Sequence, residues 1–237
     1  RDLHSFPTRR SSDLQQAKNR LYIIVAAISL SLFSIIGVLF ASRQKTLREL
    51  HAKNAIIEEE KKRSDELLLN VLPEEVMHEL KLSGKTQARN YPNATVLFAD
   101  IKGFTKISEK LSPDELIEAL DTYFERFDKV IEKYGIEKIK TIGDAYVCAG
   151  GIPSKNICKP ETVVKAALEF QDEVAKLRIE RERLGKQTFE FRIGLHTGPL
   201  IAGVIGVKKF AYDIWGDTVN MAARMQQESE AGKVNIS

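Results

Sequence analysis

Two short apolar runs, each followed by an aspartate, constrain the fold of this chain more than any other feature. The run Thr95–Ala99 is rich in β-branched and aromatic residues and leads directly into Asp100. The segment Ile136–Ala149 is β-rich on both sides of Gly143-Asp144. Two such runs joined by Gly-Asp are typical of a hairpin with its tip at these two residues. If the first strand pairs beside the hairpin, both carboxylates lie at one end of a sheet.

Two neighbouring carboxylates form an anionic, oxygen-rich site. Such a site suits Mg²⁺ or Mn²⁺ as a ligand set. In the second interpretation, Asp144 is only a turn residue and Asp100 only caps the helix that follows it. The spacing of the residues alone leaves both interpretations open.

A long uncharged segment near the N-terminus has the length of a membrane span. Leu21–Ala41 contains no charged residue and is bracketed by Arg20 and Arg43. A helix of this length rises roughly 30 Å, enough to cross the hydrocarbon core of a bilayer. The run is too long for a signal peptide, and no small-residue cleavage site follows it. Basic residues follow it more densely than they precede it, which favours a cytoplasmic C-terminal side.

The charged segment 42–72 is predicted to be a helical signalling linker. Polar residues inside a heptad seam weaken a coiled coil but fix its register, so the pattern favours a parallel dimer. A single solvated helix is the alternative. Pro73 is expected to end this helix at Leu72. The seam positions are Leu47, Leu50, Asn54, Ile57, Lys61, Ser64, Leu68 and Val71.

Residues 1–14 have no apolar periodicity and contain several helix breakers. They are similar to translated sequencing-adapter sequence, so we treat them as a non-native leader and exclude them from the fold prediction. A native juxtamembrane tail is the alternative.

The rest of the chain carries strand and helix signals in the order β-α-α-β-β-α-β-β-α. A capping box with proline at the first helical position opens a helix at Ser112 that Gly135 closes. This order predicts an α+β fold, an antiparallel sheet with helices on one face. The helix stripe expected to face the sheet is Leu116, Ile117, Leu120, Phe124, Phe127, Val130 and Ile131. Helices are further expected over 74–82, 103–110, 161–184 and 218–228, and later strands over 189–195, 198–206, 210–214 and 233–237.

Three motifs occur along the chain in one order: FADIKGFT at 98–105, KTIGDAY at 140–146 and YDIWGDTVNMAARM at 212–225. Together they resemble the catalytic domain of class III nucleotidyl cyclases, of the adenylate type. The resemblance implies a ferredoxin-like palm over 91–237. The preceding LLLNVLPEEV resembles the transducer element found before many cyclase domains, which implies a transducer segment over 73–90.

The resemblance implies roles for five residues around the triphosphate. Asp100 and Asp144, assisted by the backbone carbonyl of Ile101, would bind two Mg²⁺ or Mn²⁺ ions. Asn220 would orient the ribose, and Arg224 would stabilise charge on the α-phosphate, because its planar donors match phosphate oxygens. The short helix after Gly103 would point free N–H groups at a phosphate.

Two further residues, Lys140 and Asp213, occupy the positions at which the family reads the purine. Lysine only donates and can serve adenine N1, while a carboxylate accepts from the adenine 6-amino group. Guanylate-type members carry Glu and Cys there instead. The pair therefore favours ATP over GTP.

The expected function is that of a membrane-anchored adenylate cyclase, which converts ATP to 3′,5′-cyclic AMP and pyrophosphate by in-line attack of the 3′-hydroxyl. In the family, one site takes its metal pair and its Asn/Arg pair from different subunits, so a symmetric homodimer is expected. The catalytic domain would lie on the cytoplasmic side of a cell membrane, by expectation a bacterial inner membrane. No nucleic-acid partner is expected.

Three alternatives stay open. The chain could prefer GTP as a guanylate cyclase, or it could be a catalytically silent cyclase-like module that only dimerises. It ends at Ser237, before the family lysine that binds the triphosphate, so weak or absent activity of this fragment is the third. A diguanylate cyclase is disfavoured because the GGDEF signature is absent from the sequence.

Overall fold

The computed structural model describes residues 9–153, 158–206 and 209–237. The chain divides into two compact units, the first ending at Asp65 and the second running from Glu66 to Ser237. Most of the predicted leader, residues 1–8, lies outside the described residues. The remaining leader residues begin the first helix.

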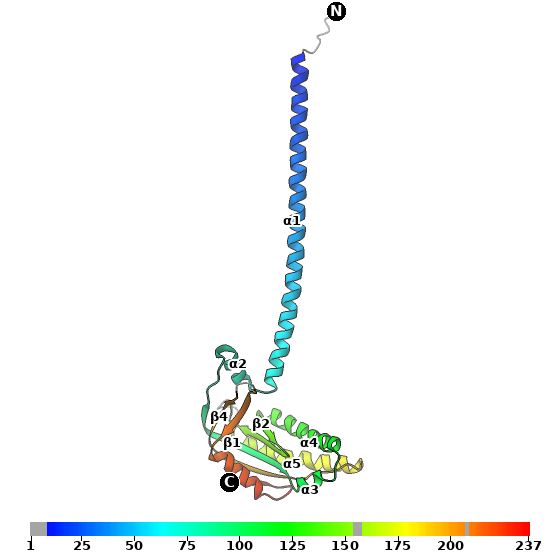
Figure 1. The fold of residues 1–237 in the computed structure, drawn as a ribbon. Helices are drawn as coiled ribbons and strands as arrows, with labels where there is room; N and C mark the ends of the chain where they lie inside the picture. The colour runs from blue at the N-terminus through cyan, green and yellow to red at the C-terminus, as the bar shows by residue number, and fades with distance from the viewer. Residues whose placement is uncertain (1–8, 154–157, 207–208) are drawn as a thin grey trace, which may run out of the picture. The chain divides into compact units, whose positions relative to one another are not determined.

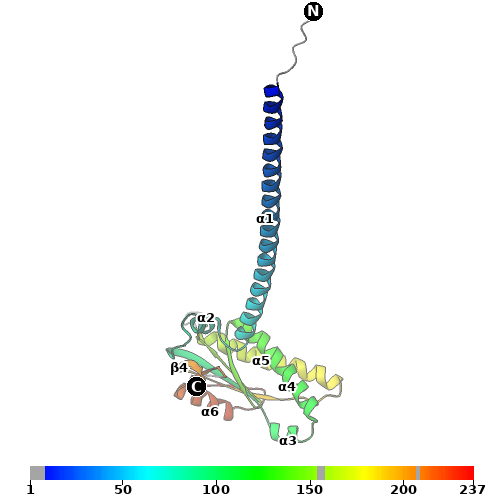
Figure 2. The ribbon, with the colours of Figure 1, turned by 45° about the horizontal axis from the view of Figure 1, so that its top comes forward.

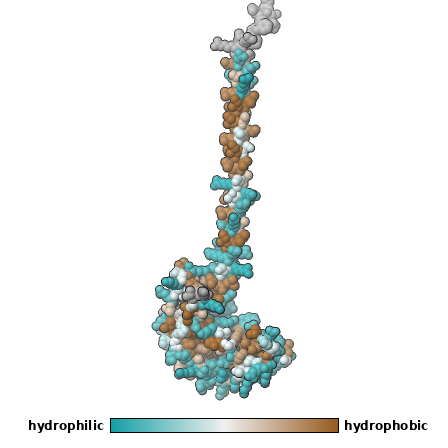
Figure 3. Space-filling model, in the orientation of Figure 1, coloured by the Kyte–Doolittle hydropathy of each residue, from teal (hydrophilic) through white to brown (hydrophobic). Residues whose placement is uncertain are grey.

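Helix α1 (Arg9–Leu69) is one continuous helix (Figure 1). It is the helix among the described residues that is long and apolar enough to cross a membrane, with a mean hydropathy of 2.7 in its most apolar window. Figure 3 shows hydrophobic side chains gathered on its N-terminal half. The helix ends at Leu69, three residues before the predicted end. The Leu72 N–H then bonds to the Leu68 carbonyl at 2.9 Å, and the chain turns so that the Leu72 side chain is buried.

The second unit is built on a six-stranded sheet in which five strands follow the order β2-β3-β1-β4-β5. Neighbours along this order are antiparallel, whereas β6 pairs with β4 in parallel. The strands are β1 (Arg89–Ile101), β2 (Glu137–Ile142), β3 (Ala145–Gly150), β4 (Phe191–Ile205), β5 (Ala211–Trp215) and β6 (Val234–Ile236).

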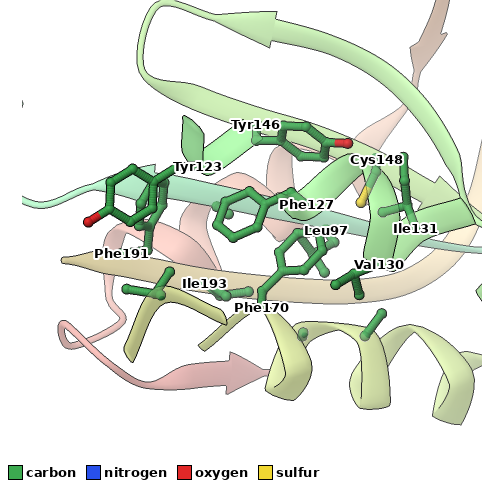
Figure 4. Packing of buried hydrophobic residues seen from close by; sticks show 14 of the residues in the cluster. Leu97, Tyr123, Phe127, Val130, Ile131, Tyr146, Cys148, Phe170, Phe191 and Ile193 are labelled. Carbon is green, nitrogen blue, oxygen red and sulfur yellow. The ribbon is translucent and has the colours of Figure 1, made fainter. Parts of the chain in front are cut away.

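Helices cover both faces of this sheet (Figure 2). The long helices α4 (Pro113–Tyr134) and α5 (Pro160–Arg183) pack on one face around an aromatic core shown in Figure 4. The shorter helices α2 (Glu74–Ser83) and α6 (Asp217–Gln227) bury side chains in a second cluster on the opposite face. The predicted palm is confirmed, and these two shorter helices add a layer beyond the single helical face of the prediction.

The start of α4 follows its sequence closely. The Ser112 hydroxyl accepts from the Glu115 N–H, and the Ser112 N–H donates to the Glu115 carboxylate at 2.9 Å, so the predicted capping box is present. The predicted apolar stripe is partly wrong. Ile117 is 58% exposed, whereas Tyr123 is fully buried and its hydroxyl accepts from the Phe189 N–H. Ile117 and Tyr123 are six residues apart on α4, so they lie on different sides of the helix, and only the tyrosine faces the sheet.

One strand replaces the two that were predicted over 189–195 and 198–206. Strand β4 is continuous across Pro199, because the ladder to β1 shifts between Tyr91 and Ala94. Such a shift is a bulge, and it tolerates a proline that cannot donate a ladder hydrogen bond.

The aromatic core predicts a large difference between two substitutions on α4. Phe127 is fully buried and stacks on Phe170 with ring centroids 4.1 Å apart. We expect Phe127→Ala to lower the free energy of unfolding by about 4 kcal/mol, because it opens a cavity. Ile117→Ala, at an exposed position of the same helix, should change it by about 0.5 kcal/mol or less. Urea unfolding followed by the fluorescence of Trp215, the single tryptophan, measures both. Equal losses would contradict the described packing.

Candidate functional site: two aspartates at the end of the sheet

The two aspartates lie at the same end of the sheet. The ladder between β1 and β3 runs up to the pair Ala99–Tyr146. Asp100 follows directly after Ala99, and Asp144 lies at the tip of the β2–β3 hairpin. Gly143 at this tip has φ 62°, a left-handed conformation that favours glycine. The predicted hairpin is therefore present, with its tip where the sequence placed it.

Electrostatics show that the two carboxyl groups interact. Burial raises the pKa of Asp144, and the negative charge of Asp100 raises it further, while a hydrogen bond from the Ile101 backbone opposes both effects. Two carboxylates this close repel each other unless a proton or a cation lies between them. The structure thus brings Asp100 and Asp144 together, as the sequence predicted. The Ile101 contact involves its N–H, and the role of the Ile101 carbonyl stays a prediction.

The donor set fits a hard divalent cation, because it consists of carboxylate and backbone oxygens. Among the described residues, no group of three or more His, Cys, Asp or Glu side chains could hold a metal ion. A cation at Asp100 and Asp144 would complete its coordination with backbone oxygens, water or a phosphate-bearing ligand.

Arg192 of β4 lies beside the acidic pair and is not among the residues predicted from the sequence. Arg192 pairs across the sheet with Asp100, and its Nη2 lies 3.5 Å from Asp100 Oδ1. Its Nε is buried and has no hydrogen-bond partner among the described residues. A guanidinium N–H beside an acidic pair can donate to a phosphate oxygen. The sequence signal for this residue is an arginine between two apolar residues, Phe191 and Ile193, in a strand whose side chains alternate between the two faces of the sheet.

Lys140 and Asp213 are in direct contact within one chain. Lys140 Nζ on β2 lies 2.5 Å from Asp213 Oδ2 on β5. The other Asp213 oxygen accepts from the Ile214 N–H at 2.8 Å, which fixes the carboxylate. The lysine side chain is 41% exposed and the aspartate side chain 18% exposed. The predicted pair therefore forms an accessible donor beside an oriented acceptor.

Asn220 and Arg224 lie on one exposed face of α6. Within the described part of the chain, neither side chain has a hydrogen-bond or ion-pair partner, and neither contacts Asp100 or Asp144 in this way. The helix itself is held tightly against β4. A Cβ at Gly194 would lie 1.9 Å from the backbone nitrogen of Gln226. This pair is therefore presented on a helix that packs closely against β4.

Helix α3 (Phe104–Ser108), predicted to bind a phosphate through its N–H groups, has only five residues. Its first residue follows Gly103, which has φ 72°. The phosphate role of this segment stays a prediction.

Comparison with known proteins connects this geometry to a family. The family model described as the adenylate and guanylate cyclase catalytic domain matches residues 86–237. An adenylate cyclase of Mycobacterium tuberculosis is 36% identical over 208 residues, which cover 87% of this chain and 46% of the relative. Human atrial natriuretic peptide receptor 2 is 39% identical over 181 residues, 76% of this chain and 17% of the receptor. The chain thus spans less than half the length of these relatives.

Solved structures agree with the fold. The crystal structure of the adenylyl cyclase CyaB from P. aeruginosa has 32% identity and a TM-score of 0.60, covering 64% of this chain and 79% of that one. The catalytic core of a rhodopsin-guanylyl cyclase with converted specificity, in complex with ATPαS, has 34% identity and a TM-score of 0.56, covering 64% and 80%. With the match over 86–237, this chain belongs to the adenylate and guanylate cyclase catalytic domain family, the class III nucleotidyl cyclases.

Proposed function

We propose that this chain is the catalytic part of a membrane-anchored adenylate cyclase, which forms 3′,5′-cyclic AMP and pyrophosphate from ATP. The observation that carries the proposal is the convergence of Asp100 and Asp144 at the end of the sheet, where burial and then the Asp100 charge raise the pKa of Asp144. The proposed organisation is a transmembrane segment over 21–41, a helical linker over 42–72, a transducer segment over 73–90 and the catalytic domain over 91–237.

Asp100, Asp144 and the carbonyl of Ile101 would hold Mg²⁺ or Mn²⁺. When bound, these ions would favour deprotonation of the attacking 3′-hydroxyl and neutralise charge on the triphosphate. Arg192 supports this role from the protein side, because its partly exposed guanidinium lies 3.5 Å from Asp100 Oδ1 and its positive charge attracts a phosphate. The acidic pair and Arg192 would together orient the triphosphate for in-line attack, so that positioning supplies much of the catalysis.

Lys140 and Asp213 would read the purine. Lys140 can donate to adenine N1, and Asp213 can accept from the 6-amino group. The N–H of Ile214 already holds one Asp213 oxygen, so the carboxylate keeps its orientation when a base enters. Guanine presents the opposite donor and acceptor pattern at these two positions, which would leave a lysine facing a donor.

Asn220 and Arg224 would complete the site of a second copy of the chain. They are exposed and unpaired within the described residues of their own chain, as a pair reserved for another subunit must be. A symmetric homodimer would then contain two equivalent sites. The exposed seam residues of α1, with Leu50 at 52% and Ile57 at 58%, would hold two chains parallel and pass a signal to the catalytic domains.

Removing one metal ligand tests the central role of the acidic pair. We expect the full-length protein that contains this chain to form cyclic AMP from ATP and Mn²⁺. Asp144→Asn should lower kcat at least about 100-fold, because half of the carboxylate pair loses its charge. Asp121→Asn, an exposed aspartate on α4, serves as the matched control and should keep its activity. Unchanged turnover in Asp144→Asn rejects the metal assignment, and an inactive wild-type protein favours the silent module.

Mixing two inactive variants tests the shared site. Asp144→Asn and Arg224→Ala each damage both sites of a homodimer. Heterodimers that combine them contain one intact site, so statistical mixing should restore about a quarter of the wild-type activity. Cyclic AMP formation after co-expression of the two variants measures this. If co-expression restores nothing although heterodimers form, each site lies within one chain.

Substitution of Lys140 and Asp213, the two proposed purine-binding residues, tests the preference for ATP over GTP. A GTP-specific enzyme is the second candidate, because receptor-type guanylate cyclases also match this chain, one from Caenorhabditis elegans at 35% identity. We expect kcat/KM for ATP to exceed that for GTP by about 100-fold or more, since the wrong base leaves polar groups unpaired. Lys140→Glu combined with Asp213→Cys should shift the ratio towards GTP. A ratio near one in the wild-type protein contradicts the assignment.

A further inference from the structure

Strand β2 changes face in its middle. Residues two apart in a regular strand point to the same face of the sheet. Here Lys138 pairs with Cys148 and Lys140 pairs with Val147, so Ile139 is an extra residue, a β-bulge. Cys148 belongs to the core cluster beneath α4 and α5, whereas Val147 belongs to the cluster on the opposite face. The bulge therefore directs Lys138 and Lys140 to opposite faces.

Three polar side chains on the α4 face form a closed cluster, which we name the hairpin clamp: Asp128, Lys138 and Tyr146. The Tyr146 hydroxyl donates to Asp128 Oδ1. Lys138 Nζ donates to Asp128 Oδ2 at 2.8 Å and lies 5.0 Å from the centroid of the Tyr146 ring. One carboxylate on α4 thus binds β2 through Lys138 and β3 through Tyr146.

The clamp is connected to the acidic pair through Tyr146. Tyr146 is fully buried, and its ring meets that of Phe127 edge-on at 5.5 Å (Figure 4). In the sheet it pairs with Ala99, the residue before Asp100. It also follows Asp144 by two positions in the chain. A displacement of Tyr146 would therefore change the position of one carboxylate relative to the other.

The hairpin clamp is connected to Lys140 and Asp213, the proposed purine-binding residues, through the bulge. On the far side of Ile139, Lys140 reaches Asp213 of β5. Without the extra residue, Lys140 would lie on the same face as Lys138 and would point towards α4. The ion pair between Lys138 and Asp128 connects the first half of β2 to α4, on the near side of the bulge.

We propose that Asp128 is a positioning residue, which through the hairpin clamp fixes both the β2 bulge that aims Lys140 and the hairpin tip that carries Asp144. The inference rests on the proposed function for the roles of Lys140 and Asp144. Asp128 itself touches no substrate atom in this account. A purely structural role, in which Asp128 only stabilises the hairpin, makes different predictions.

Asp128→Asn in the full-length protein tests the inference, because it removes the charge and keeps the size of the side chain. We expect Mn²⁺ affinity in the presence of a non-reactive ATP analogue to fall about tenfold, a typical loss when support of a metal ligand is removed. The electron paramagnetic resonance signal of free Mn²⁺ measures this without any need for turnover. The preference for ATP over GTP, measured as the ratio of kcat/KM values, should also fall several-fold. Lys138→Met should reproduce both effects, and Lys138→Arg, which keeps the ion pair, should restore most of the wild-type values.

Asp121→Asn is the matched control. Asp121 lies seven residues earlier on the same helix, is exposed, and makes no hydrogen bond or ion pair within the described residues. A lowered melting temperature in Asp128→Asn with unchanged Mn²⁺ affinity and unchanged base preference overturns the inference. If Asp128→Asn does not fold, Tyr146→Phe, which removes a single hydroxyl, takes its place. A wild-type protein that binds Mn²⁺ but forms no cyclic nucleotide refutes the proposed function alone, because the affinity comparison still decides the role of Asp128.

Discussion

The antiparallel register between β1 and β3 sets the distance between two carboxylates that repel each other. Ala99 and Tyr146 are the last pair of this ladder, so Asp100 and Asp144 come together at its end. Burial and, after it, the repulsion from Asp100 raise the pKa of Asp144, and both cost stability when the carboxylate is charged. The aromatic core beneath the ladder offsets this cost, because the rings around Phe127 and Tyr146 bury large apolar areas. In the proposed function, cations and a triphosphate would occupy this site and relieve the repulsion.

The two faces of the sheet differ in what they contribute to the proposed site. The face beneath α4 and α5 is closely packed and anchors the hairpin through Asp128. The opposite face carries Lys140, which reaches Asp213 of the edge strand β5, and helix α6, whose exposed side carries Asn220 and Arg224. Because of the bulge at Ile139, the single strand β2 places Lys138 on one face of the sheet and Lys140 on the other.

Local sequence signals predicted the parts of this structure that depend on neighbours in the chain. The capping box at Ser112 and the hairpin tip at Gly143 follow from residues a few positions apart, and the convergence of the aspartates follows from pairing one strand beside that hairpin. The missed features depend on partners far away in sequence. The continuity of β4 needs a bulge in β1, and the role of Arg192 becomes visible only when Asp100 lies across the sheet. Tyr123 lies seven residues after Leu116 and four before Phe127, so the helical period includes it in the stripe. The sequence does not show the partner of its buried hydroxyl, which is the distant Phe189 N–H.

The central claim is that Asp100 and Asp144 bind divalent cations beneath a triphosphate. A crystal structure of the dimeric catalytic domain with Mn²⁺ and a non-reactive ATP analogue, analysed by anomalous scattering at the manganese edge, tests it most directly. The account predicts anomalous peaks within coordination distance of both carboxylates, about 2.2 Å, with Arg224 of the second subunit at the α-phosphate. Peaks elsewhere, or a nucleotide bound without metal at this pair, would contradict it.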